Sequence, residues 1–181
     1  WERLIRTYVR QVYDFIGPSR DILGPDVNTD EQVMAWMFDE YGRREGYSPA
    51  IVLGKPVDAH GSYGRREAPG RGLGLIARRM LADQNKRIVD AKVAVQGFGN
   101  LGRAVALWFF QQGAKVVAVT DRASGVRRDD GLHIPSLLDH ASEGRSLAGF
   151  PGADAVNADD VLALDVDVLV PASLGSVIDE N

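Results

Sequence analysis

The stretch that decides the fold reads Lys92-Val-Ala-Val-Gln-Gly97-Phe-Gly-Asn-Leu-Gly102. It continues through residues 103–112 into Gly113-Ala-Lys-Val-Val-Ala-Val-Thr-Asp121. A short run of β-branched residues enters a glycine-rich turn, a helix-length segment follows, and a second apolar run ends in an acid. This order predicts a strand, a turn, a helix and a second strand, joined by the right-handed crossover that parallel strands require.

Three glycines in this stretch have the spacing of a dinucleotide-binding turn. Gly97 permits the tight turn, Gly99 lets the backbone approach a pyrophosphate, and Gly102 lets the helix pack close to the strand. The start of the helix offers free N–H groups and a partial positive charge to phosphates. Asp121 follows Gly97 at close to the ~20 residues expected for an acid that binds ribose. The stretch therefore predicts a dinucleotide site rather than a plain strand-to-helix turn.

Composition places the protein in the ordinary globular class. Apolar residues make up 45% and charged residues 25% of the chain, which is typical of a soluble domain with a core. The net charge of -4 argues against nucleic acid as the main partner. No apolar run approaches the ~20 residues of a membrane span, so no membrane contact is expected.

The absence of cysteine excludes disulfides, thiolate catalysis and cysteine metal sites, and no metal site is predicted. No signal-peptide pattern opens the chain, so we expect a cytoplasmic protein. The chain begins with Trp1, already inside an amphipathic pattern, which leads us to expect a piece of a longer protein.

Two parts are predicted, with a boundary near residues 65–70. In the first part, apolar residues recur at helical spacing from Leu4 to Ile16. Thr29-Asp-Glu-Gln32 then forms a capping box, with Thr29 as the N-cap of a second helix. Residues 46–72 are dense in Gly and Pro, and loops of this length inside compact domains are usually functional.

The second part alternates helix and strand signals. A helix from residue 66 or 70 to 85 leads into the central strand, and the later segments are a short helix at 134–141, a short strand at 153–157, a helix at 158–164 and a strand at 166–170. Residues 122–131 are polar and rich in arginine. This alternation predicts an α/β fold with a Rossmann-like, doubly wound parallel sheet.

Four blocks of sequence, in this order, resemble the Glu/Leu/Phe/Val dehydrogenase family, and within it the hexameric glutamate dehydrogenases. The blocks are Gly24-Pro-Asp-Val-Asn-Thr29 with Met34-Ala-Trp-Met-Phe-Asp-Glu-Tyr41, Gly54-Lys-Pro56, Gly61-Ser-Tyr-Gly-Arg65 with Glu67-Ala-Pro-Gly-Arg-Gly72, and Gln96-Gly-Phe-Gly-Asn-Leu-Gly102. Val166-Asp-Val-Leu-Val-Pro-Ala-Ser173 agrees as well. The resemblance implies reversible oxidation of L-glutamate to 2-oxoglutarate and ammonia, with hydride transfer to NAD or NADP.

The resemblance also implies how the chain is divided and assembled. Residues 1–68 would be the C-terminal part of a substrate (dimerisation) domain. Residues 69–181 would be an NAD(P)-binding Rossmann domain, truncated at its C-terminal end. The partners implied are an amino acid or 2-oxo acid as substrate, and further copies of the chain in a homo-hexamer of the full-length protein.

The resemblance implies individual site residues. Asp26 aligns with the aspartate that shuttles protons during imine hydrolysis, and Gly24 with a small residue that lines the substrate pocket. Arg65 aligns with the arginine that meets the nicotinamide carboxamide. Pro69 replaces the threonine partner of that arginine, which removes a hydroxyl and an N–H, and His60 replaces a glycine. The remaining implied cofactor-binding residues are Gly97, Phe98, Gly99, Asn100, Leu101, Gly102, Asp121, Arg122, Ala172 and Ser173.

The sequence leaves the choice between NAD and NADP open, with a lean to NAD. Asp121 at the end of the second strand would accept a hydrogen bond from a ribose 2′-hydroxyl, which favours NAD. Arg122, with Arg127 and Arg128 nearby, would suit the additional phosphate of NADP.

The family's catalytic lysines lie in a Gly-Gly-x-Lys-Gly-Gly segment that this chain does not contain. None of its four lysines, at positions 55, 86, 92 and 115, is expected to replace them. We therefore expect residues 1–181 alone to bind dinucleotide without oxidising glutamate. Two alternatives stay open: a dehydrogenase of another amino acid such as leucine, phenylalanine or valine, and a non-catalytic dinucleotide-sensing module, which Pro69 and His60 favour.

Overall fold

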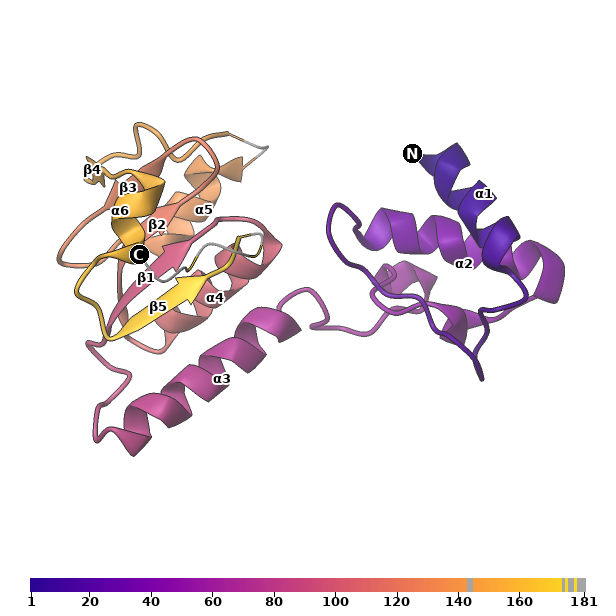
Figure 1. The fold of residues 1–181 in the computed structure, drawn as a ribbon, viewed down its shortest axis with the longest axis horizontal. Coiled ribbons are helices and arrows are strands. Elements are labelled where there is room, and N and C mark those ends of the chain that lie inside the picture. The colour runs from indigo at the N-terminus through magenta and orange to yellow at the C-terminus, as the bar shows by residue number, and fades with distance from the viewer. Residues whose placement is uncertain (143–144, 174, 176–177, 179–181) are drawn as a thin grey trace. The chain divides into compact units, whose positions relative to one another are not determined.

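The computed structural model describes residues 1–142, 145–173, 175 and 178, and it divides into two compact units, Trp1–Arg66 and Glu67–Asn181 (Figure 1). Each unit has its own hydrophobic core. No helix within the described ranges is both long enough and apolar enough to cross a bilayer.

The first unit is helical. It contains α1 (Glu2–Val12), α2 (Glu31–Glu45) and the short 3-10 turns η1 (Pro49–Ile51) and η2 (Val57–Ala59). Ile5 and Val9 of α1 pack with Met34 and Met37 of α2 in the buried core. The apolar spacing predicted a helix as far as Ile16, but α1 ends at Val12 because the chain turns there and Ile16 forms a bridge with Asp21.

The start of α2 differs from the prediction. Asp30, not Thr29, is the N-cap, and its carboxylate accepts a hydrogen bond from the N–H of Val33. Thr29 instead closes the preceding loop, where its hydroxyl accepts from the N–H of Asp26 at 2.6 Å and donates to the Asp26 carbonyl at 2.8 Å. The interpretation of Thr29 as the N-cap was therefore wrong, because two adjacent residues both had N-cap chemistry.

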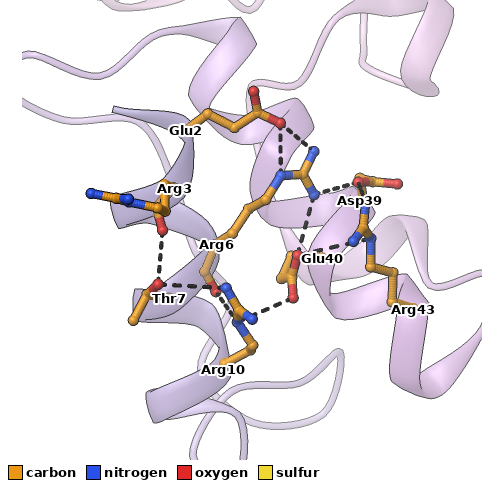
Figure 2. A network of polar contacts seen from close by, with 8 residues as sticks. All are labelled: Glu2, Arg3, Arg6, Thr7, Arg10, Asp39, Glu40 and Arg43. Carbon is orange, nitrogen blue, oxygen red and sulfur yellow. Dashed lines mark hydrogen bonds and ion pairs between the residues drawn. The ribbon is translucent and has the colours of Figure 1, made fainter.

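A network of charged side chains joins α1 to α2 (Figure 2). Glu40 is buried, with only 7% of its side chain exposed, and it lies 3.3 Å from Arg6 and 3.4 Å from Arg10. Arg6 also pairs with Asp39 and with Glu2. The exposed Arg43 pairs with Asp39 and with Glu40. The hydrogen bond from Arg6 holds the pKa of Asp39 below its usual value. No spacing pattern in the sequence predicted this network.

The second unit is built on a five-stranded sheet of order β4-β3-β2-β1-β5. Its strands are β1 (Lys92–Gln96), β2 (Lys115–Thr120), β3 (Gly125–Arg127), β4 (Asp154–Ala155) and β5 (Val168–Pro171); its helices are α3 (Ala68–Asp83), α4 (Asn100–Gln111), α5 (Ile134–His140) and α6 (Ala158–Leu162). Strands β2, β1 and β5 are parallel, whereas β3 and β4 are antiparallel. The predicted α/β fold with a Rossmann-like sheet is confirmed, and the sheet is mostly parallel, with β3 and β4 antiparallel.

Helices cover both faces of this sheet, as the near-continuous apolar strands require. Val93 and Val95 of β1 pack in the large core that includes Phe109 of α4, whereas Ala94 between them packs with Val161 of α6 on the other face. Side chains on adjacent strand positions point to opposite faces, which explains this division. Strand β3 was not predicted, because Val126 is the only apolar branched residue in its segment.

Glycines on α3 let this helix approach α4 closely. A Cβ added to Gly70 would lie 2.7 Å from the Cβ of Ala104, and one added to Gly74 would lie 2.2 Å from the Trp108 ring. A Cβ added to Gly72, two positions along, would meet nothing within 4 Å. The α3–α4 contact thus depends on particular glycines rather than on all of them.

Strand β5 lies at one edge of the sheet (Figure 1). Within the described residues it pairs with β1 only. A groove of about 330 Å³ lies between β5 and α3, with Leu73, Ile76, Met80 and Leu169 among its apolar lining.

Candidate functional site

The glycine-rich turn lies at the carboxyl end of β1, between the ends of its two neighbouring strands. Gly97 has φ = +97°, a backbone conformation that favours glycine, and its N–H donates to the carbonyl of Thr120 in β2 at 2.9 Å. A Cβ on Gly97 would lie 2.8 Å from the carbonyl oxygen of Ala172, after β5. A Cβ on Gly102 would lie 1.9 Å from the carbonyl oxygen of Gly97. These two positions therefore have no room for a side chain.

Gly99 has different surroundings from these two glycines. It is the N-cap of α4, no side chain caps the helix, and a Cβ at Gly99 would meet nothing within 4 Å. The first N–H groups of α4, at Asn100 and Leu101, have no carbonyl partner inside the helix. Open space in front of free N–H groups at a positive helix end fits the diphosphate of a dinucleotide.

The side chains of Phe98 and Arg103 stabilise the glycine-rich turn. The Phe98 side chain is buried in the core, so it packs against the body of the domain rather than facing solvent. Arg103 donates to the carbonyl of Phe98 at 2.9 Å and to that of Ala141 at 2.8 Å, and its guanidinium lies 5.4 Å from the Phe98 ring centroid. Arg103 was not predicted, and its place in the first turn of α4 is the signal that could have identified it.

The segment after β5 lies beside the glycine turn. The N–H of Ala172 donates to the carbonyl of Gln96 at 2.7 Å, and the Ser173 hydroxyl donates to the Gln96 side-chain oxygen at 3.1 Å. The structure therefore brings Ala172 and Ser173 together with residues 97–102, as the predicted cofactor site requires.

Asp121 follows β2 directly, and both of its carboxylate oxygens accept hydrogen bonds from loops. Oδ1 accepts from the N–H groups of Ala123 and Ser124 at 2.8 and 2.7 Å and from the Ser124 hydroxyl at 3.1 Å, while Oδ2 accepts from the N–H of Leu147 at 3.0 Å. Burial raises the pKa of Asp121, but these hydrogen bonds outweigh it and hold the pKa below its usual value. Asp121 thus anchors two loops as an ionised carboxylate.

The three arginines considered near the ribose do not lie together. Arg122 follows β2 directly and is exposed. Arg127 lies on β3 opposite Ala118, and its guanidinium pairs with Asp129 at 2.9 Å. The N–H of Arg128 bonds to the carbonyl of Val117, farther from the carboxyl end of β2. The chain reverses direction into β3 after Arg122, and a contact of Arg127 or Arg128 with a 2′-phosphate stays a prediction.

Asp26 and Gly24, predicted for the substrate side, lie in the first unit, and so does Arg65, which was predicted to bind the cofactor. Asp26 is exposed, and its Oδ1 accepts from the N–H of Val27 at 2.8 Å, while its Oδ2 has no partner among the described residues. A Cβ on Gly54 would lie 2.8 Å from Pro25, which precedes Asp26, and 3.9 Å from the Arg65 side chain. Pro25 and Arg65 therefore both lie next to Gly54. Gly24 lies in the same loop, beside Leu53.

Two departures from the family pattern have simple local structures. Pro69 is in the first turn of α3, where a residue without an N–H costs the helix nothing. His60 has φ = +66°, the conformation that suits the glycine it replaces, and its ring contacts Tyr47 edge-on at 5.2 Å between centroids.

The fold and the glycine turn define a protein with a Rossmann-type nucleotide-binding domain that follows a helical unit. The family model described as Glutamate/Leucine/Phenylalanine/Valine dehydrogenase matches residues 61–181, and the model described as Glu/Leu/Phe/Val dehydrogenase, dimerisation domain, matches residues 1–43. The chain belongs to this dehydrogenase family.

Known relatives are glutamate dehydrogenases. The NADP-specific glutamate dehydrogenase of Synechocystis sp. is 45% identical over 98% of this chain and 44% of its own length. The hetero-hexameric glutamate dehydrogenase of Thermus thermophilus, in a Leu-bound form, has a TM-score of 0.87 and 38% identity over 98% of this chain and 42% of its own. The glutamate dehydrogenase of Peptoniphilus asaccharolyticus has a TM-score of 0.69 and 33% identity over 96% of this chain and 40% of its own. The chain thus spans less than half the length of these relatives.

Proposed function

We propose that the protein catalyses the reversible oxidative deamination of L-glutamate. L-glutamate, NAD(P)⁺ and water give 2-oxoglutarate, ammonium, NAD(P)H and a proton. The observation that carries this proposal is the 45% identity to a glutamate dehydrogenase across 98% of the chain. A glycine turn that fits a diphosphate supports it independently.

In this proposal the two units have separate roles. Residues 69–181 bind the dinucleotide, which accepts the hydride from the α-carbon of glutamate. Residues 1–68 contribute to the substrate side, where Gly24 lines the pocket and Arg65 meets the nicotinamide carboxamide beside Pro69. Free N–H groups at Asn100 and Leu101 hold the diphosphate, with Gly97, Gly99 and Gly102 shaping the turn and Ala172 and Ser173 beside it.

Asp26 is the proposed proton carrier during hydrolysis of the substrate imine. A general acid or base needs an oxygen that a substrate or a water molecule can reach, and Oδ2 of Asp26 is exposed and unpaired within the described residues. Asp26→Asn is expected to lower kcat by about 10²- to 10⁴-fold and to leave dinucleotide binding unchanged.

The matched control for this test is Asp58→Asn, which removes an exposed carboxylate from another loop of the same unit. The rate of NAD(P)H formation with glutamate, followed by absorbance, is compared in the full-length protein for both variants and for the unmodified sequence. Equal rates for Asp26→Asn and Asp58→Asn would remove Asp26 from the mechanism.

We also propose that residues 1–181 by themselves bind dinucleotide without oxidising glutamate. Lys55 donates to the carbonyl of Val52 at 3.1 Å, and Lys86 pairs with Asp167 at 2.6 Å. Lys92 and Lys115 begin β1 and β2, at the opposite end of the strands from the glycine turn. These positions support the view that none of the four acts as a catalytic lysine. Glutamate-dependent reduction of NAD(P)⁺ by this segment alone would contradict the proposal.

Substrate choice and assembly are tested separately. A dehydrogenase of leucine, phenylalanine or valine is the main alternative, and a panel of these amino acids beside glutamate distinguishes the two. A dinucleotide-sensing module would bind NAD(P) and oxidise none of them. A homo-hexamer of the full-length protein is the proposed assembly, to be checked by light scattering. The cytoplasmic location stays a prediction.

The lean to NAD depended on Asp121 as a ribose acceptor, and it stays untested. The hydrogen bonds that Asp121 already accepts weaken that basis. The Synechocystis relative is named as NADP-specific, which supports the other choice.

A further inference from the structure

Arg103 connects two backbone carbonyls that are far apart in the sequence. Its Nε donates to the carbonyl of Phe98 at 2.9 Å, and its Nη2 donates to the carbonyl of Ala141 at 2.8 Å. Ala141 is the C-cap of α5 and is buried in the same core as Phe109 of α4. Arg103 thus fastens the glycine-rich turn to the end of a helix that belongs to the core.

Phe98, whose carbonyl Arg103 holds, is restrained through its side chain as well. Phe98 is 6% exposed, and its ring centroid lies 5.4 Å from the Arg103 guanidinium. A guanidinium at this distance from an aromatic ring is attracted to it. With both its ring and its carbonyl held, Phe98 keeps one conformation.

A fixed Phe98 carbonyl also fixes the direction of the amide that follows it. No cis peptide bond occurs among the described residues, so the Gly99 N–H points the opposite way from the Phe98 carbonyl. That carbonyl is directed at Arg103, and the Gly99 N–H is therefore directed away from Arg103. Within the described part of the chain, this N–H has no hydrogen-bond partner.

The glycines on either side of Phe98 make this restraint necessary. Glycine reaches backbone conformations that other residues avoid, so a turn with Gly97 and Gly99 has more ways to rotate than most. A Cβ at Gly99 would meet nothing within 4 Å, so no packing at that position limits the rotation. The hydrogen bond from Arg103 supplies the restraint that the glycines lack.

The place of Arg103 in its helix runs against the usual preference of helices for charge. The start of a helix carries a partial positive charge, and a cation in the first turn is unfavourable there. The first turn of α4 contains no acidic residue that would offset it. A residue that breaks a local preference in this way is more typical of a functional site than of a purely structural position.

We propose that Arg103 is a positioning residue for the dinucleotide. By holding the Phe98 carbonyl it directs the Gly99 N–H at the diphosphate, together with the N–H groups of Asn100 and Leu101. This inference rests on the proposed function, in which the glycine turn binds that diphosphate. Because Arg103 acts through the backbone of the turn, its loss should affect NAD and NADP alike.

Isothermal titration calorimetry of the full-length protein with NAD and with NADP tests the proposal. Arg103→Met keeps the apolar stem and removes every donor, and it is expected to weaken binding of both dinucleotides by the same factor, about tenfold or more, because a charge-assisted contact to the diphosphate is lost. The expected factor is equal for the two because they share the diphosphate. A loss confined to one of them would overturn the proposal.

Arg103→Gln separates the hydrogen bond from the charge. The Gln side-chain nitrogen stands at the same place along the side chain as the Arg Nε, so it can still donate to the Phe98 carbonyl without a charge. This variant is expected to bind both dinucleotides within about threefold of the unmodified protein. Binding as weak as that of Arg103→Met would show that the charge acts instead, and would overturn the role in positioning.

Val161→Ala is the control for a loss of stability. Val161 is fully buried and packs with Ala94 and Ala118, on the opposite face of the sheet from α4. The variant should have a lower Tm and should keep both affinities within about twofold. If it weakens binding as much as Arg103→Met does, the effect of Arg103 is on stability alone, and the proposal fails.

Hydrogen exchange on the unmodified protein provides a measurement that needs no variant to fold. Mass spectrometry with fragmentation to single residues follows the amide of Gly99. The proposal predicts fast exchange in the free protein and slow exchange with saturating NADP, since the N–H then donates to the diphosphate. Exchange at Gly99 that NADP leaves unchanged would overturn the proposal.

Failure of this inference and failure of the proposed function have different results. If Arg103→Met binds NAD and NADP as the unmodified protein does, the role of Arg103 is wrong while dinucleotide binding stands. If the folded, unmodified full-length protein binds neither NAD nor NADP, the proposed function fails, and this inference fails with it.

Discussion

Gly102 and Gly99 belong to one motif but have opposite surroundings. A side chain at Gly102 would collide with the Gly97 carbonyl at 1.9 Å, whereas one at Gly99 would enter open space. Gly102→Ala is therefore expected to lower the free energy of unfolding by about 3 kcal/mol, because the backbone must shift. Gly99→Ala should cost less than about 1 kcal/mol, since its φ of -77° suits any residue.

The effect on dinucleotide binding should be more direct for Gly99→Ala than for Gly102→Ala. Gly99→Ala is expected to weaken dinucleotide binding in a protein that remains folded, because the added methyl occupies the approach to the N–H groups of α4. Urea denaturation gives the stability of each variant, and calorimetry with the dinucleotide gives its affinity. Gly99→Ala with unaltered affinity would show that the diphosphate does not approach this residue.

Asp121 gives the protein a pH-dependent contribution to stability. Its pKa in the folded state is below the unfolded value of ~3.9, so the contribution is fully present above that value and is lost as the pH falls through the folded pKa. Asp121→Asn should lower the free energy of unfolding by about 1 kcal/mol at neutral pH. The difference from the unmodified protein should disappear as the pH falls below ~4.

Tm measured over a pH series tests this expectation. Asp58→Asn, at an exposed position, serves as the control for the loss of one negative charge. A difference between Asp121→Asn and the unmodified protein that stays constant down to acid pH would contradict an ionised, loop-anchoring Asp121.

At the residue scale, the sequence predicted which residue type a position needs better than which residues that position contacts. The need for glycine at Gly97 and Gly102 follows from the motif, and the structure agrees. The partners of Asp121 come from Leu147 and the turn at 123–124, and no local pattern indicates a contact with a loop so distant in sequence. Contact of any of these residues with a cofactor or substrate stays a prediction.

At the element scale, the packing of α3 on α4 gives a matched pair of substitutions. Gly70→Ala places a methyl 2.7 Å from the Ala104 Cβ and the Val105 nitrogen, and should cost about 2 kcal/mol of unfolding free energy. Gly72→Ala, in the same helix, meets nothing and should stabilise the protein by up to about 1 kcal/mol through helix propensity. Thermal unfolding of both variants checks the sign, and two changes of the same sign would contradict this packing.

The network between α1 and α2 predicts a second element-scale effect (Figure 2). Glu40→Gln leaves Arg6, whose side chain is 16% exposed, without the buried carboxylate, and should lower the free energy of unfolding by about 2 kcal/mol. Arg43→Gln removes an exposed partner 3.9 Å from the same carboxylate, and its cost should stay below about 0.5 kcal/mol. Chemical denaturation followed by circular dichroism compares them, and equal costs would show that burial of Glu40 does not matter.

Elements were predictable where periodicity was strong. Strands β1 and β2 and helices α3 and α4 follow from apolar runs and glycine punctuation. Strand β3 was missed because a short antiparallel strand at Gly125–Arg127 depends on pairing with β2 rather than on its own composition. The charged network was missed because ion pairs between helices about 35 residues apart leave no spacing signal.

At the scale of the whole molecule, the division into two units makes a prediction for limited proteolysis. The unit boundary falls at Arg66 and Glu67, where the Arg66 side chain is 68% exposed and Tyr63 nearby is 89% exposed. Trypsin is expected to cleave first after Arg65 or Arg66, because exposed backbone between compact units is the preferred cleavage site. Mass spectrometry should find fragments close to 1–66 and 67–181.

The result that would contradict this boundary is a first cleavage inside a unit, for example after Arg79 in α3, whose side chain is 80% exposed. Arg65→Gln with Arg66→Gln is the control, and it should abolish the early pair of fragments. The sequence predicted the boundary near residues 65–70 from the Gly- and Pro-dense loop and the helix that follows it, and the domain roles of the two parts stay a proposal. Long-range order within each unit was less predictable, because it depends on pairings such as β3 with β4.

The outer edge of β5 has a consequence for handling the protein in solution. Among the residues that the structure describes, no strand pairs with the outer main-chain groups of β5, which adjoin the apolar groove against α3, and such an edge is a template to which strands of other molecules can add. Concentrated samples of this 181-residue chain should therefore become turbid with time, and a lysine in place of Leu169 should delay it. Crystallisation and spectroscopy would benefit from dilute, freshly prepared material.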